Sequence, residues 1–179
     1  MDAKKHPGIY LFAVALAVVS FSASAGTGCN INANKRVVIG HRPTAATLYS
    51  HIQNVGAGSW QAGFDTETFV YIGDVHIKPS KSGEPEKIYK IGHLKTIATR
   101  QCIEFDRLFI FGAKDEYLGQ YAPVEVNAKK IKIQGTSLVF PFHKKDGNTL
   151  DLKDGPPAKT QLDGDEVDWA PNPNPAPPL

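Results

Sequence analysis

Residues 88–121 have the clearest strand pattern of the chain and read IYKIGHLKTIATRQCIEFDRLFIFGAKDEYLGQY. Residues 88–97, 102–111 and 117–121 are rich in the β-branched and aromatic side chains that suit a strand. The polar run GAKDE at 112–116 separates the last two and predicts a hairpin that joins 108–111 to 117–121. Consecutive strands joined by short turns predict an antiparallel meander.

The pattern continues toward the C-terminus with expected strands at 124–126, 130–133 and 138–142, and with a turn at 134–136. A turn at 144–148 and an edge strand at 149–153 follow. One face of this meander should point toward a core, and it carries Ile131, Ile133, Leu138, Phe140 and Phe142.

Toward the N-terminus, residues 35–40 read as a first strand, and residues 43–55 have apolar side chains at helical spacing. Pro43 and Thr44 can begin that helix and Gly56 can end it, although Leu48 and Ile52 also fit an alternating strand. Residues 59–77 alternate mostly with a period of two and predict strands. Residues 79–85 form an exposed loop, which is either a plain connection or a binding loop.

These expectations give a mainly β fold: a single antiparallel meander sheet that forms a small barrel or sandwich, with at most one or two short helices. The globular domain is expected at residues 26–154. Spacing alone does not decide between a barrel and a sandwich.

Residues 1–25 have the three parts of a secretory signal peptide: a basic start with Lys4 and Lys5, an apolar run at 9–19 and the small residues SASA at 22–25. Cleavage is expected after Ala25, in a periplasmic or secreted protein. A retained membrane anchor is the alternative, but the apolar run is shorter than the roughly 20 residues that a spanning helix needs. A lipid-anchored form would require cleavage just before Cys29.

Removal of this segment takes away Lys4, Lys5 and Asp2, so the 20 basic and 18 acidic residues become 18 and 17. This near-neutral balance argues against nucleic acid and against an anionic membrane surface as the main partner. Stable membrane insertion is not expected.

The two cysteines, Cys29 and Cys102, both lie in the predicted mature chain. Paired thiols oxidise in exported proteins, so a Cys29–Cys102 disulfide is expected. Two free thiols or a metal pair remain the alternative, without a C-x-x-C motif to support it.

Residues 155–179 are expected to form a flexible, acidic and proline-rich tail, because they contain few apolar side chains. The acidic run at 163–168 reads as a solvated linker, since it lacks the spacing of an EF-hand calcium loop. Trp169 is the exception in this tail and is a candidate for docking on the domain or on a partner.

Evidence for catalysis or metal binding is weak. No two of the five mature-chain histidines have the spacing that brings both to one metal ion from a strand or a helix, so His76, His93 and His143 are only weak metal candidates. No serine lies in a G-x-S-x-G motif, and no cofactor is expected. Glu104 and Asp106 share one strand face, which is more simply a polar face than a glycosidase pair.

The sequence therefore favours a binding or accessory protein over an enzyme. Its partner would be another exported protein or an envelope component, contacted through loops, a sheet edge or exposed aromatic residues such as Trp60 and Trp169. The alternative is a small exported hydrolase, with or without an assisting metal ion, that uses some of His76, His93 and His143 with Asp74 or Asp106. Its catalytic residues cannot be assigned from the sequence.

Overall fold

The computed structural model describes residues 36–40, 43–55, 66–98, 103–122, 124, 127–141, 149–162 and 164–174. The signal-peptide segment, Trp60, His143 and both cysteines lie outside these residues, so the predictions that concern them remain predictions. The elements are β1 (Arg36–Ile39), α1 (Pro43–Asn54), β2 (Thr66–Ile77), β3 (Lys87–Ala98), β4 (Ile103–Phe111), β5 (Tyr117–Tyr121), the 3-10 helix η1 (Ala128–Lys130), β6 (Lys132–Gln134), β7 (Ser137–Val139), β8 (Thr149–Asp151), β9 (Lys159–Leu162) and β10 (Asp165–Pro171).

The described strands form two sheets. The larger has the order β1-β2-β3-β4-β5-β10-β9 and the smaller has the order β6-β7-β8. All pairs are antiparallel except β1 with β2, which are parallel. The two ends of the larger sheet, β1 and β9, do not pair with each other, so the described strands close no barrel. The mainly β class, the antiparallel meander and the short helix are thus confirmed, and the second sheet fits the sandwich alternative.

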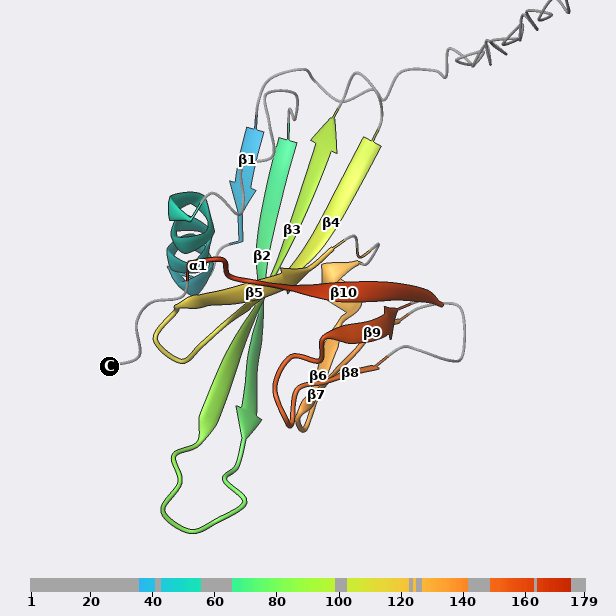
Figure 1. The fold of residues 1–179 in the computed structure, drawn as a ribbon. Helices are drawn as coiled ribbons and strands as arrows, with labels where there is room; N and C mark the ends of the chain where they lie inside the picture. Colours follow the sequence, from blue (N-terminus) through green and yellow to red (C-terminus); the bar gives the residue numbers. More distant parts are fainter. Residues whose placement is uncertain are drawn as a thin grey trace, which may run out of the picture.

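Two cores lie on opposite sides of the larger sheet (Figure 1). On one side, α1 packs Ala45, Leu48 and Ile52 against the sheet, and this helix-side core is rich in aromatic rings. On the other side, the small sheet contributes Leu138 and Leu150 to a mostly aliphatic core. The strands therefore alternate between two apolar environments, as a sheet that is covered on both faces requires.

A β-bulge in β2 changes the core into which the side chains of the strand pack. Tyr71 pairs with Gly92, whereas Gly73 pairs with Ile91, so one extra residue enters β2 between these two pairs. Because side chains alternate across a strand, this extra residue reverses the alternation. Phe69 consequently packs on the helix side, while Val75 packs on the small-sheet side.

The glycine of this bulge lies close to the small sheet. A Cβ atom at Gly73 would stand 2.8 Å from Cδ1 of Ile133, on β6. Such a distance is shorter than real side-chain contacts allow, so glycine lets β6 approach β2 closely. The two sheets meet at this point of contact.

The turns follow the predicted chemistry. Gly112 N donates to Glu116 O at 2.9 Å in the β4–β5 hairpin, and Asp115 takes a left-handed conformation there with φ 66°. Aspartate is one of the few residues other than glycine that tolerates this conformation. Two expected strands differ: the strand expected at 130–133 is observed as β6 at 132–134, because Lys130 ends a 3-10 helix, and Val124 lies outside any strand.

The structure corrects the expected flexible tail. Residues 159–171 form β9 and β10, and β10 pairs with β5 through Trp169 and Tyr121. The side chains of Leu162 and Val167 are 3% and 4% exposed and join the small-sheet-side core. Composition misled here because the few apolar residues of this segment alternate with its charges, which is the pattern of a half-buried strand.

Candidate functional site

The histidines proposed as weak metal candidates do not converge. His76 alternates with Val75 and Ile77, which face the small sheet, so it points to the helix side of the larger sheet. His93 aligns with Leu108, a member of the small-sheet-side core, and so lies on the opposite face. Among the described residues no three His, Cys, Asp or Glu side chains are grouped as a metal would need. His143 lies outside the described part of the chain.

His93 instead lies beside Asp106 in a buried pair. Its Nε2 atom is 3.1 Å from Asp106 Oδ1, and the two side chains are only 4% and 7% exposed. Neither atom makes a well-aligned hydrogen bond within the described residues, so the contact is an ion pair when His93 is protonated. Burying a charged group without a partner costs free energy, so removal of either side chain should destabilise the fold by leaving the other without its partner.

This pair belongs to a row of alternating charges across β3 and β4. Lys95 is the direct cross-strand partner of Asp106, and Lys95 Nζ donates to Glu104 Oε2 at the exposed end. Glu104 and Asp106 do share one strand face, as the sequence suggests. The lysine between them makes this face a ladder of ion pairs rather than a pair of catalytic carboxylates.

A second polar group lies on the helix side, between α1 and the larger sheet. Tyr49 donates to Glu67 Oε2 at 2.5 Å, and the pKa of Tyr49 is raised well above its usual value by burial and by this carboxylate. Arg107 is 2% exposed, and burial lowers its pKa to about 10 while Tyr117 and Glu67 raise it. Burial raises the pKa of Tyr117 to about 12, and Arg107 opposes that shift. Sequence reasoning missed this group, because its members lie on four separate elements.

A third polar surface lies on the far half of the β2–β3 hairpin. We define the hairpin face as Asp74, His76, Glu86, Ile88 and Lys90; Tyr71 lies at its inner edge, where it packs against the helix-side core. Tyr71 donates to Asp74 Oδ1 at 2.6 Å, and His76 Nδ1 is 3.2 Å from Glu86 Oε1. Lys90 forms an ion pair with Asp115 from the β4–β5 turn.

This surface extends beyond the cover of the helix. The helix-side core contains no residue from 72 to 90, so α1 does not bury that part of the hairpin. The His76 side chain is 53% exposed, and every residue from 78 to 87 is exposed. Figure 1 shows this end of the hairpin projecting past the other elements. Asp74 and His76, named in the hydrolase alternative, therefore belong to an open surface rather than to an enclosed site.

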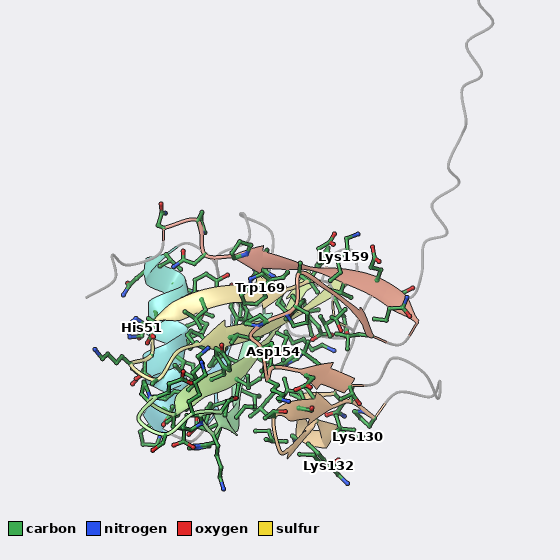
Figure 2. All side chains as sticks on the ribbon, turned by 60° about the horizontal axis from the view of Figure 1, so that its bottom comes forward. His51, Lys130, Lys132, Asp154, Lys159 and Trp169 are labelled. Atoms are coloured by element: carbon green, nitrogen blue, oxygen red, sulfur yellow. The ribbon has the colours of Figure 1, made fainter. Side chains whose placement is uncertain are left out.

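Trp169 has a structural place. Its ring packs on Tyr121, with ring centroids 4.9 Å apart, and lies over Gly119, where a Cβ atom would come within 2.4 Å of the indole. The backbone N of Trp169 donates to Ala158 O, and Tyr121 Oη donates to Pro157 O. These contacts hold the C-terminal strands to the domain, and Figure 2 shows Trp169 against the larger sheet. Trp60, the other candidate aromatic, lies outside the described residues.

A scan against protein-family models and searches of curated proteins and of solved structures found no match to the chain. In the part of the chain that the structure describes, no helix has the length and apolar character to cross a membrane.

Proposed function

We propose that the protein is an exported β-domain that binds another exported protein or an envelope component through its β2–β3 hairpin. The observation that carries this proposal is the hairpin face, a polar surface that neither α1 nor the small sheet covers. Export itself rests on the signal-peptide pattern of residues 1–25.

One face of the hairpin packs on the domain, and the opposite face is exposed. On the small-sheet side, Val75 and Ile77 are 0% and 8% exposed and fix the hairpin to the domain. On the helix side, Asp74, His76 and Ile88 are left without a covering layer. A surface held by a packed scaffold loses little conformational entropy on binding, which favours recognition.

The chemistry of the hairpin face fits a protein or glycan surface with hydrogen-bonding groups. It offers the exposed imidazole of His76 and the exposed carboxylate of Glu86 beside the aliphatic side chain of Ile88. Asp74 and Lys90 are held in place by Tyr71 and Asp115. Its exposed ion pair, His76 with Glu86, contributes little to stability, about 0–1 kcal/mol, so a partner can replace it at low cost.

Site-specific photo-cross-linking in bacteria that export the protein tests this proposal. A photoreactive residue in place of Lys81, at the hairpin loop, should give a discrete cross-linked species. The same residue in place of Lys153, which is also exposed but lies after β8, is the matched control and should give none. Equal cross-linking from both positions, or from Lys153 alone, would contradict the proposal.

The hydrolase alternative gains no support from the described residues, because His76 and His93 lie on opposite faces of the sheet.

A further inference from the structure

Lys129, Lys130 and Lys132 form a second surface, which lies on η1 and β6 and shares no residue with the hairpin face. We define these three residues as the lysine surface. All three are exposed, and within the described chain none of them makes an ion pair. Among the other described lysines, Lys90, Lys95 and Lys159 are paired with carboxylates, and Lys78, Lys81, Lys87, Lys114 and Lys153 are exposed without an ion pair. Lys129, Lys130 and Lys132 differ from these in lying within four consecutive residues. The charge of the lysine surface is therefore free for a partner.

Local structure forces these side chains outward. Asn127 caps η1, with its Oδ1 accepting from Lys129 N at 3.1 Å. Ile131 is 8% exposed and joins the small-sheet-side core, and Ile133 packs partly against the same core. Since η1 and the start of β6 are pinned by these contacts, the lysines are presented on a fixed backbone. Figure 2 places Lys130, on η1, and Lys132, on β6, at the opposite end of the domain from His51 on α1.

Among the described residues, no carboxylate forms an ion pair with this surface. The sequence from 127 to 139 contains no acidic residue. Asp151, on β8, accepts hydrogen bonds from Thr136 Oγ1 and Lys153 N and forms no ion pair with the three lysines. Three neighbouring ammonium groups without counter-charges repel one another and destabilise the fold. Binding of an anionic group would relieve this repulsion.

We propose that the lysine surface docks an acidic segment of the exported partner. This inference rests on the proposed binding function and adds a second point of contact to it. An acidic polypeptide is favoured over nucleic acid or an anionic membrane because the predicted mature chain has 18 basic and 17 acidic residues. Polyanions of high charge density draw their affinity from larger basic clusters than three lysines. Short acidic segments need only a few correctly placed cations.

Binding of a fluorescent hexaglutamate peptide to the purified mature protein tests this inference. Binding should be measurable at low salt and should weaken as salt rises. The triple variant Lys129→Gln, Lys130→Gln and Lys132→Gln should bind about tenfold more weakly or worse, since each exposed charge pair contributes a modest amount. The matched control, Lys78→Gln, Lys81→Gln and Lys87→Gln, loses the same charge from the hairpin and should bind as the unchanged protein does.

An equal loss in the control variant would overturn the inference, because it would show that net charge rather than the lysine surface attracts the peptide. Binding to phosphatidylglycerol vesicles without binding to the peptide would overturn it in favour of a membrane surface. The absence of any binding would also overturn it. The peptide is added to purified protein, so these results are independent of the cross-links from Lys81 and a failure of either proposal can be recognised separately.

Discussion

The two halves of β2 differ in what covers them. In the first half, Phe69 packs under α1 in the helix-side core; in the second half, Val75 and Ile77 pack under the small sheet. The bulge between Tyr71 and Gly73 makes this change possible, because it reverses the side-chain alternation. A single irregularity thus anchors the hairpin on one side and leaves its other side without a covering layer.

The two cores also differ in how they hold buried charge. The helix-side core surrounds Arg107 with Glu67 and Tyr117, and the small-sheet side places His93 against Asp106. Each arrangement offsets part of the cost of removing charge from water. The variants below are directed at one core or the other, in order of decreasing expected effect.

Truncation after Asp154 should have the largest effect. It removes β9 and β10 and with them Leu162, Val167 and Trp169 from the small-sheet-side core. Each buried apolar side chain contributes roughly 1.5–3 kcal/mol, so unfolding should become easier by about 5 kcal/mol or more. Urea denaturation measures this change. Truncation after Asn174 keeps both strands and is the control; similar stability of the two truncated proteins would contradict the structural role of β9 and β10.

Breaking the buried pair should have the next largest effect. Asp106→Leu leaves His93 without its partner and should cost about 3–5 kcal/mol. The double variant His93→Leu with Asp106→Leu should be more stable than the two single losses added together predict, because it leaves no unpaired buried charge. A double-mutant cycle in urea measures the coupling. Strictly additive losses would show that the two groups do not interact.

Disturbing the close contact between Gly73 and Ile133 at the bulge should lower the free energy of unfolding by a smaller amount. Gly73→Ala brings a Cβ atom against Ile133 and should destabilise by about 1–3 kcal/mol. Ile133→Val removes the Cδ1 atom that this Cβ would meet, so the same Gly73 substitution should cost less in that background. Thermal melts of the four proteins measure the difference. An unchanged cost would place the strain in the backbone of Gly73 rather than in its contact with β6.

On the helix side, Tyr49→Phe removes the hydroxyl group that donates to Glu67. The expected loss is about 1–2 kcal/mol, since the carboxylate is left with one donor fewer. Urea denaturation measures this loss. The control is Ser50→Ala, which removes an exposed hydroxyl group that donates to Ala46 O within α1. A loss no larger than that of the control would contradict the role of this hydrogen bond.

A further effect should be seen only in alkali. The pKa of Tyr117 is raised by burial from 10.0 to about 12, so the unfolded chain loses this proton at lower pH than the folded protein does. The associated stability is fully present below pH 10 and is lost as the pH rises to 12. Tyr117→Phe should therefore flatten part of the alkaline fall in stability, and the fall caused by Tyr121, whose pKa burial also raises, should remain. An identical alkaline fall in the variant would contradict this assignment.

Much of the fold follows from local pattern. Period-two alternation and the polar turn at 112–116 place the β3–β4–β5 meander, and the apolar spacing of residues 43–55 places α1. The pairing of β1 with β2 in parallel does not follow from any local pattern, because it depends on the path of the chain between them. The bulge is likewise visible only when β2 is aligned with β3.

The C-terminal strands show what composition overlooks. Asp165 pairs with Leu162, and Gly164 has φ 88°, so a two-residue turn joins β9 to β10. The dipeptide Asp163-Gly164 is a strong hairpin signal that was available in the sequence. The high average polarity of the segment concealed both this turn signal and the alternation of Val167 and Trp169 with charged residues. The hairpin face was partly foreseeable, because the loop at 79–85 was a candidate binding loop, but its open side depends on the bulge.

The central claim is that the open side of the hairpin binds the partner. Its most direct test is the photo-cross-link from Lys81, measured in a variant that carries His76→Ala and Glu86→Ala on the hairpin face. These side chains are exposed, so the melting temperature should be nearly unchanged. If the partner binds this side of the hairpin, the cross-linked species should be strongly reduced while the protein remains folded. An undiminished cross-link from the folded variant would contradict the central claim.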